Sequence, residues 1–250
     1  NVRGGSFDEN SIYINGNEIY RPFLIKSGQQ EGLSVISPYM VENIDFSNGG
    51  FTAKYGDKMS SVLDITYKKP EKFESVVSAS LMSADAYIGF GNKKFSWTNS
   101  FRYNNNRFLL NSLETSGEYR PNFTDYQTYF SYRPNSKWSF DIIGNYNSNH
   151  YNFYPKTRET TFGTMDNVKS FNVYFDGQEN DIFKTTSATF GITRQFSPIS
   201  SISLIASSFT SNEKEQYDIQ SQYWLTQTES QENLGVGTFF EHARNYLKAN

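Results

Sequence analysis

Aromatic side chains in polar segments are the residues of this chain best suited to contact a substrate. Their ring faces stack on sugars and on peptide groups, and tyrosine and tryptophan also offer a polar atom. The same rings would suit a membrane-interface girdle or the packing of loops. The candidate substrate contacts lie in or beside segments that we expect to be loops: Tyr119, Tyr151, Phe153, Tyr154, Tyr174, Tyr223 and Trp224.

Patterns of catalytic or metal-binding residues are missing from the sequence. The chain has no cysteine, which removes disulfide scaffolds, thiolate zinc sites and cysteine nucleophiles. Its two histidines, His150 and His242, stand on an expected loop and on a late strand, without carboxylate partners at metal spacing. Glu213 and Glu215 lie in polar loop sequence rather than in an acid–base arrangement. We therefore expect no enzymatic activity, no metal and no cofactor.

The overall composition favours a membrane β-barrel. Aromatic residues make up 17% of the 250 residues, yet the mean hydropathy is −0.65. A transmembrane strand needs only ~9–11 residues, of which alternate ones meet lipid, so a barrel combines many rings with a polar average. The net charge is −3, without the basic surplus typical of a nucleic-acid binder. We expect outer-membrane lipid as a partner and no nucleic acid.

Alternation of apolar and polar residues predicts antiparallel strands from about residue 73 onward. Trp138, Phe140 and Ile142 alternate with Ser139 and Asp141, and the same period of two recurs in further runs. Because one register satisfies this period, the apolar side chains should point to lipid and the polar ones to the barrel interior. The same rule assigns Phe130, Tyr132, Phe190 and Ile192 to lipid and Gln127 and Thr189 to the interior.

Short turns and long connections alternate along this region. Tight turns are expected at 91–94, 134–137 and 197–200, and long polar loops at 104–122 and 147–181. Outer-membrane barrels have such short periplasmic turns and longer extracellular loops. About seven strands are expected in all, the first of them running unbroken from 74 to 90.

The first part of the chain lacks the barrel pattern and opens with a tight hairpin. Asn15-Gly16 stands between two short runs of β-forming residues in the stretch SIYINGNEIYRP. Both central residues of a type I′ turn take positive φ, which Asn and Gly tolerate. The chain thus begins within folded structure, and no charged and apolar leader precedes the hairpin. We expect a fragment whose secretion signal is cleaved or missing.

Two stretches in this part resemble the plug domain of TonB-dependent outer-membrane transporters. One is NVRGG at 1–5 followed by the hairpin at 11–22, where an Asn-Gly turn replaces an Asp-Gly-like one. The other, VENIDFSNGGFTAKYGDKMSSVLDITYK at 41–68, is similar to the final plug strand, a glycine turn, an A-x-Y-G step and the run into the barrel. Within the family, this stretch resembles most the Bacteroidetes branch, which includes SusC-like receptors. The residues that carry this resemblance are Phe46, Gly50, Phe51 and Tyr55.

The resemblance implies an all-β chain with a small α+β plug portion, forming part of a plugged transmembrane antiparallel barrel. Residues 1–70 would be the C-terminal part of the plug, and 71–250 the first strands of a barrel that has about 22 in this family. Arg3, Arg21 and Glu42 could pair with charges of the barrel wall. Positions with a conformational role in the plug would be Arg3, Gly4, Gly5, Asn15, Gly16, Gly49, Gly50, Tyr55 and Gly56.

The function that the resemblance implies is TonB-dependent active uptake of a nutrient across the bacterial outer membrane. A glycan, a peptide or a metal chelate would each suit such a transporter. Its partners would be the TonB–ExbB–ExbD complex, acting through a segment that precedes this chain, and a surface lipoprotein of SusD type. Two other classes stay open: a passive or structural barrel such as a porin or adhesin, and a soluble β-rich carbohydrate-binding module. The plug motifs weigh against the former and the asymmetric turns against the latter.

Overall fold

The described residues of the chain are almost wholly β-strand. The computed structural model describes residues 10–19, 36–52, 54–55, 60–105, 117–164, 167–229 and 238–248. One short 3-10 helix, η2 (Pro38–Met40), is the only helix among them. The all-β fold class is therefore confirmed, whereas the α part of an α+β plug is not found in the described ranges. None of their helices is long and apolar enough to cross a membrane.

A small four-stranded sheet forms the first part of the chain, with the strand order β2-β1-β4-β3. The hairpin turn has φ values of 51° at Asn15 and 78° at Gly16, which confirms the predicted turn with two positive φ angles. β1 pairs antiparallel with β2 but parallel with β4, from Asn10↔Ser61 to Ile14↔Ile65. The strands are β1 (Asn10–Ile14), β2 (Asn17–Glu18), β3 (Val41–Ser47) and β4 (Ser61–Tyr67).

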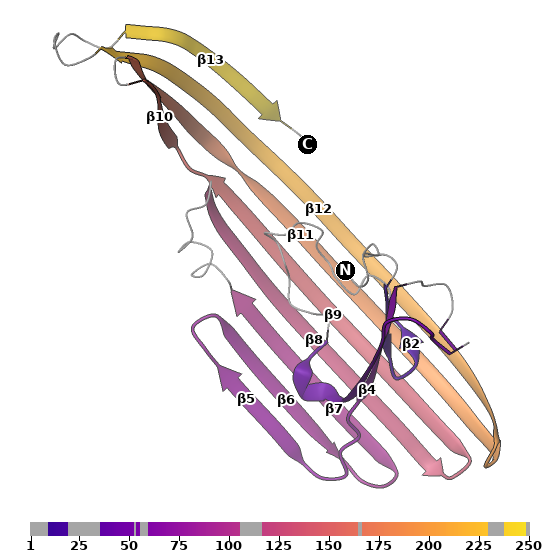
Figure 1. The fold of residues 1–250 in the computed structure, drawn as a ribbon. Coiled ribbons are helices and arrows are strands. Elements are labelled where there is room, and N and C mark those ends of the chain that lie inside the picture. Colours follow the sequence, from indigo (N-terminus) through magenta and orange to yellow (C-terminus); the bar gives the residue numbers. More distant parts are fainter. Residues whose placement is uncertain are drawn as a thin grey trace. The chain divides into compact units, whose positions relative to one another are not determined.

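The rest of the chain forms a second sheet of nine strands (Figure 1). Its order is β13-β12-β11-β9-β8-β7-β6-β5, and β10 pairs with β11 beside this path. Ile12 and Val62 belong to the first sheet, whereas Phe140 belongs to the second. The first part of the chain and the later strands therefore form separate sheets. The strands are β5 (Glu74–Ala79), β6 (Ser83–Gly91), β7 (Phe95–Asn105), β8 (Gly117–Asn135), β9 (Trp138–Pro155), β10 (Arg158–Thr164), β11 (Asn167–Ser197), β12 (Ser200–Glu229) and β13 (Thr238–Lys248).

The three expected tight turns are confirmed, but the strand count and the first strand were wrong. The stretch 74–90 is divided into β5 and β6, which pair antiparallel from Glu74↔Gly89 to Ala79↔Ala84. The Ser80 hydroxyl accepts hydrogen bonds from the backbone N–H of Met82 at 3.3 Å and of Ser83 at 3.0 Å. A serine side chain that satisfies two amides in this way favours a turn. The sequence did not predict this turn, because the apolar side chains of Leu81 and Met82 continue a strand pattern.

The prediction of long loops was also wrong for 147–181. This stretch contains the end of β9, all of β10 and the beginning of β11, so His150 lies in a strand rather than in a loop. Strand β10 pairs with β11 in regular register from Arg158↔Val173 to Thr164↔Asn167. Side chains that are polar on both faces leave no period of two in the sequence, even where the backbone forms a ladder. The other expected loop, at 104–122, overlaps strands at both ends, because β7 ends at Asn105 and β8 begins at Gly117.

The predicted alternation of side chains between two faces is confirmed for β8 and β9. Gln127 is fully buried, whereas Tyr126 and Tyr132 on the opposite face are 40% and 41% exposed. Ile142 is 43% exposed, and its neighbour Ile143 is only 2% exposed. One face of these strands therefore carries exposed rings and aliphatic groups, and the other is covered.

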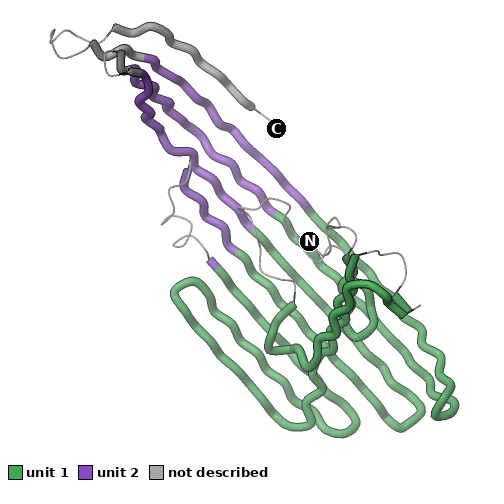
Figure 2. Tube along the Cα trace, in the orientation of Figure 1, with its two compact units in different colours: residues 1–104, 123–149, 183–212 green, residues 105–122, 150–182, 213–250 purple. Residues whose placement is uncertain are grey.

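The chain divides into two compact units, which Figure 2 shows in different colours. Unit 1 consists of residues 1–104, 123–149 and 183–212, and unit 2 of 105–122, 150–182 and 213–250. This division cuts through the long strands of the second sheet. The predicted boundary between plug and barrel at residue 70 is based on sequence motifs rather than on compactness. It stays a prediction.

An arginine in place of Ile142 tests whether the exposed face meets lipid. We expect Ile142→Arg to lower the free energy of unfolding in lipid vesicles by ~2–4 kcal/mol, the cost of a charge on the lipid face near the midplane. The matched control is Ile199→Arg, in the turn between β11 and β12, where the side chain is 98% exposed and should tolerate the charge. Denaturant titration of both variants measures the difference. Equal stabilities of the two variants would contradict a lipid-facing Ile142.

Candidate functional site

The first sheet packs against the covered face of the second sheet within unit 1. Met40 is fully buried, and the rings of Tyr67 and Tyr129 meet edge to face with centroids 6.0 Å apart. Edge-to-face contacts of this kind stabilise packing beyond the burial of area. The shared apolar cluster contains Ile12, Ile14, Met40, Ile65 and Tyr67 from the first part of the chain and Tyr87, Tyr129 and Ile143 from the second sheet.

The side-chain amide of Gln127 is the centre of a buried polar network beside this cluster. Its Oε1 accepts hydrogen bonds from the Tyr67 hydroxyl at 2.9 Å and from the backbone N–H of Ser37 at 3.2 Å. Its Nε2 donates to Asp125 Oδ2 at 2.9 Å. Burial raises the pKa of Tyr67 well above its usual value, so the hydroxyl remains a donor at physiological pH. One β8 side chain thus binds β4, the segment before η2 and its own strand.

A buried ion pair continues the network toward β7. Arg102 donates to Asp125 Oδ2 from Nε at 2.9 Å and from Nη2 at 2.7 Å, and the side chains are only 4% and 0% exposed. Nη1 of Arg102 donates to the backbone carbonyl of Ile36 at 3.1 Å. The Ser100 and Ser37 hydroxyls form a further bond of 2.7 Å. Because a buried charge needs its partner, the pair holds Arg102 in place, and the segment at 36–37 is bound to β7 and β8.

A second charged contact lies where the first sheet leads into the second. Lys69 Nζ is 3.5 Å from Asp141 Oδ1, which also accepts a hydrogen bond of 2.7 Å from the Tyr129 hydroxyl. The ammonium lies 5.5 Å from the centre of the Tyr129 ring, within the range of a cation–π contact. Burial lowers the pKa of Lys69 below its usual value, and the carboxylate of Asp141 opposes that shift. The second residue after β4 is therefore held at β9 by charge.

The residues predicted for the plug are only partly within the described ranges. Asn15 Oδ1 accepts a hydrogen bond of 2.9 Å from the backbone N–H of Tyr67, so the hairpin turn is bound to the end of β4. Tyr55 donates to Asp64 at 2.5 Å, and Gly50 has φ 66° with open space around it. Glu42 is exposed on β3. Arg3, Gly4, Gly5, Arg21 and Gly56 lie outside the described residues.

The candidate substrate contacts, predicted to lie in or beside loops, all lie in strands. Tyr119 of β8 is brought together with two rings of β9, since its centroid is 5.9 Å from that of Tyr151 and 4.7 Å from that of Phe153. Tyr154 instead contacts the Arg120 guanidinium at 4.7 Å. Tyr223 packs on Phe171 at 5.6 Å, and Trp224 is opposite His242 in the register of β12 and β13. Tyr174 is exposed in β11.

The residues that join the two sheets were missed by the sequence reasoning. A signal for them exists, because Ser96, Thr98 and Ser100 lead at every second position to Arg102 in β7. A charged residue that continues such a polar face can form a buried ion pair with a carboxylate on the polar face of the next strand. Arg102 does so with Asp125. Sequence alone does not say which segment covers that face.

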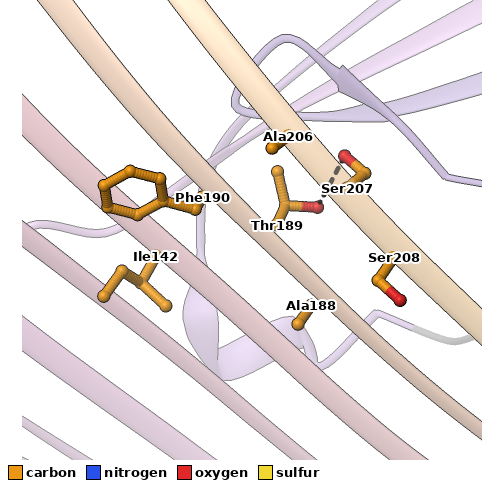
Figure 3. Close-up of a pocket in the computed structure, with 7 residues that line it drawn as sticks. All are labelled: Ile142, Ala188, Thr189, Phe190, Ala206, Ser207 and Ser208. Atoms are coloured by element: carbon orange, nitrogen blue, oxygen red, sulfur yellow. Dashed lines mark hydrogen bonds between the residues drawn. The ribbon is translucent and has the colours of Figure 1, made fainter.

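A shallow depression lies on the opposite, exposed face of unit 1 (Figure 3). Ile142, Thr189, Phe190 and Ser207 contribute to its lining, and the Thr189 and Ser207 hydroxyls are 3.2 Å apart. Ala188, Ala206 and Ser208 complete the lining. The Ile142 face is the one predicted for lipid, so the depression is separate from the contacts between the sheets.

No family model and no curated protein sequence matches the chain. Among solved structures it is similar to a mutant of the ferric enterobactin receptor PfeA from Pseudomonas aeruginosa, with 12% identity, a TM-score of 0.42, and coverage of 90% of this chain and 42% of that one. PfeA in complex with BCV-L6 has 13% identity and a TM-score of 0.41, with coverage of 90% of this chain and 42% of that one. The FpvAI–pyocin S2 complex has 9% identity and a TM-score of 0.40, with coverage of 96% of this chain and 48% of that one. The chain spans less than half the length of these structures.

Removing Arg102 tests the weight of the buried pair. We expect Arg102→Met to lower the free energy of unfolding by about 3–5 kcal/mol, because Asp125 would keep a buried charge without its partner. Arg120→Met is the matched control, since the Arg120–Glu118 pair has side chains that are 40% and 23% exposed, and its loss should change stability little. Denaturant titration of both variants in detergent gives the comparison. Equal losses would show that burial of the Arg102 pair has no energetic consequence.

Proposed function

We propose that this chain belongs to an active transporter of the bacterial outer membrane, in which the first sheet blocks a lumen formed by the second. Residues up to about 70 are the plug portion and residues 71–250 are wall strands. Nutrient enters when the plug portion rearranges, at the expense of energy from the inner membrane.

The observation that carries this proposal is the hydrogen-bonded contact between the two sheets. Gln127, Asp125 and Arg102 use the covered face of the wall strands to bind Tyr67, Ser37 and Ile36. The opposite face of the same strands exposes rings such as Tyr126 and Tyr132. A sheet with apolar groups outside and a bound polar segment inside fits a lipid-embedded wall around a plug.

The chemistry of this contact suits a part that must move and return. Hydrogen bonds and ion pairs lost on separation are replaced by bonds to water, so the net cost per bond is only ~0.5–1.5 kcal/mol. A wholly apolar interface of the same extent would be harder to separate in water, since its full area would be exposed. The smaller apolar cluster around Met40 and Ile65 supplies the specific fit.

The proposed partners follow from the same function. The TonB–ExbB–ExbD complex would supply the energy, and a surface lipoprotein of SusD type would assist capture of a glycan or peptide. The resemblance of 41–68 to the SusC-like branch supports the second partner. Asn15, Gly16, Gly50 and Tyr55 would set the conformation of the plug, together with the matching positions outside the described ranges.

A passive or structural barrel is the second candidate, and the contact between the sheets distinguishes the two. In a porin or adhesin, a segment bound to the inner face would be a fixed constriction. In an active transporter, the same segment must separate from the wall in every cycle.

A disulfide between the two parts tests the proposal directly. The chain has no cysteine, and Ser37 Oγ lies 2.7 Å from Ser100 Oγ, so Ser37→Cys with Ser100→Cys places two thiols across the contact. We expect the oxidised double variant to abolish growth of the host on any nutrient source that requires the protein. Reductant should restore that growth, because the plug portion is freed again. Electrophoresis before and after reduction measures the extent of cross-linking.

Controls separate active uptake from passive passage. Each single cysteine variant should grow normally under both redox conditions. Loss of the energising complex should stop growth as fully as the disulfide does. Continued growth with the cross-link complete, or without the complex, would favour the passive barrel.

A further inference from the structure

An exposed arginine of unit 1 lies against two rings near the tight turns. The guanidinium carbon of Arg194 in β11 is 5.1 Å from the centre of the Trp138 ring in β9 and 4.9 Å from that of the Phe196 ring. Both distances are within the range of cation–π contacts. Among the described residues, no carboxylate forms an ion pair with this guanidinium. The rings thus orient the charge of Arg194 without neutralising it.

Arg194 shares its face of the sheet with exposed apolar side chains. The Thr193 and Ser203 hydroxyls are 2.8 Å apart, so these two residues of β11 and β12 lie on one face. Because successive side chains of a strand alternate between faces, Arg194 and Ile202 lie on the other. Ile202 is 64% exposed, and Phe190, four residues before Arg194, is 43% exposed. The free charge therefore stands within an apolar surface.

The three tight turns and the strand ends beside them carry positive charges only. The ranges 91–94, 133–137 and 194–200 contain no acidic residue, and their basic residues are Lys93, Lys94, Arg133, Lys137 and Arg194. Backbone hydrogen bonds join these ranges, from Arg133 N–H to the Lys94 carbonyl at 2.6 Å and from Gln195 N–H to the Lys137 carbonyl at 2.8 Å. This rim of the sheet is therefore suited to an anionic partner.

We propose that Arg194, with the rings of Trp138 and Phe196 and with Lys137 beside them, binds the headgroup of an anionic phospholipid. A guanidinium forms bidentate, charge-assisted hydrogen bonds with a phosphate group. Aromatic rings are enriched on membrane barrels at the level where the headgroups begin. A lipid fits better than a soluble anion, because its acyl chains would cover the exposed apolar side chains around the charge.

This inference rests on the proposed function, because only a membrane wall would bring the exposed face of the sheet against lipid. It adds a preference for negatively charged lipid at one place on that wall. The two can fail separately, since contact of Trp138 with acyl chains and preference for a charged headgroup are different measurements.

Fluorescence of Trp138 provides both measurements. The chain has three tryptophans, so Trp97→Phe with Trp224→Phe leaves Trp138 as the single one. This protein is reconstituted in phosphatidylcholine vesicles that contain phosphatidylglycerol or phosphatidylcholine with brominated acyl chains, which quench tryptophan on contact. We expect the association constant at Trp138 to be about fivefold greater or more for phosphatidylglycerol, the factor that one cation at a lipid surface supplies. Inorganic phosphate should lower this preference no more than sodium chloride of equal ionic strength does.

Substitutions in the same protein test the role of Arg194. Arg194→Gln should remove most of the preference for phosphatidylglycerol. Arg194→Lys should keep part of it, because lysine retains the charge but not the bidentate geometry. Arg158→Gln is the matched control, since it removes the same charge from an exposed position of β10 in unit 2, and it should leave the preference unchanged. Circular dichroism confirms that each variant is folded.

Equal quenching by the two brominated lipids would overturn the inference and leave the membrane wall intact. A preference that survives Arg194→Gln, or that falls equally in Arg158→Gln, would also overturn it, as would specific reversal by inorganic phosphate. Quenching by neither lipid would remove the lipid-facing wall itself, and with it the proposed function.

Discussion

Burial of the Asp125 carboxylate is the constraint on which the arrangement of unit 1 depends. This fully buried group needs donors, and its Oδ2 receives them from Arg102 and Gln127. Each of these two side chains then uses its remaining polar atoms on the first part of the chain, through Ile36, Ser37 and Tyr67. The two side chains that bind this carboxylate are therefore the ones that bind the first part of the chain.

The second sheet meets two different environments with a single sequence period. Its strands place rings on one face and hydrogen-bonding groups on the other, and β8 does so over Asp125, Tyr126, Gln127 and Tyr132. A shift of the register by one residue would move the buried carboxylate to the apolar face and the rings against the first sheet. The alternation therefore fixes both the outer surface and the docking site, and neither can change alone.

Local patterns in the sequence predicted those features that depend on neighbouring residues. The Asn15-Gly16 turn, the tight turns and the faces of β8 and β9 all follow from short-range rules. The strands within 147–181 did not, because their ladders depend on pairing with β11 and not on a hydrophobic face. The Gln127 network was also missed, since Tyr67 and Gln127 are 60 residues apart and each is an ordinary polar residue in its own strand. Tyr119 and Tyr151 were chosen for their type, and only the fold shows which candidate rings meet.

The parallel pairing of β1 with β4 has a mechanical consequence. Five residue pairs join these strands, from Asn10↔Ser61 to Ile14↔Ile65, and β4 continues at its carboxyl end into the second sheet. A pull on the amino end of β1, resisted at the carboxyl end of β4, acts along the strands and loads all their hydrogen bonds together in shear. Antiparallel strands pulled from the same two chain ends would instead separate one bond at a time. A force applied in this direction is therefore shared by all the hydrogen bonds between β1 and β4.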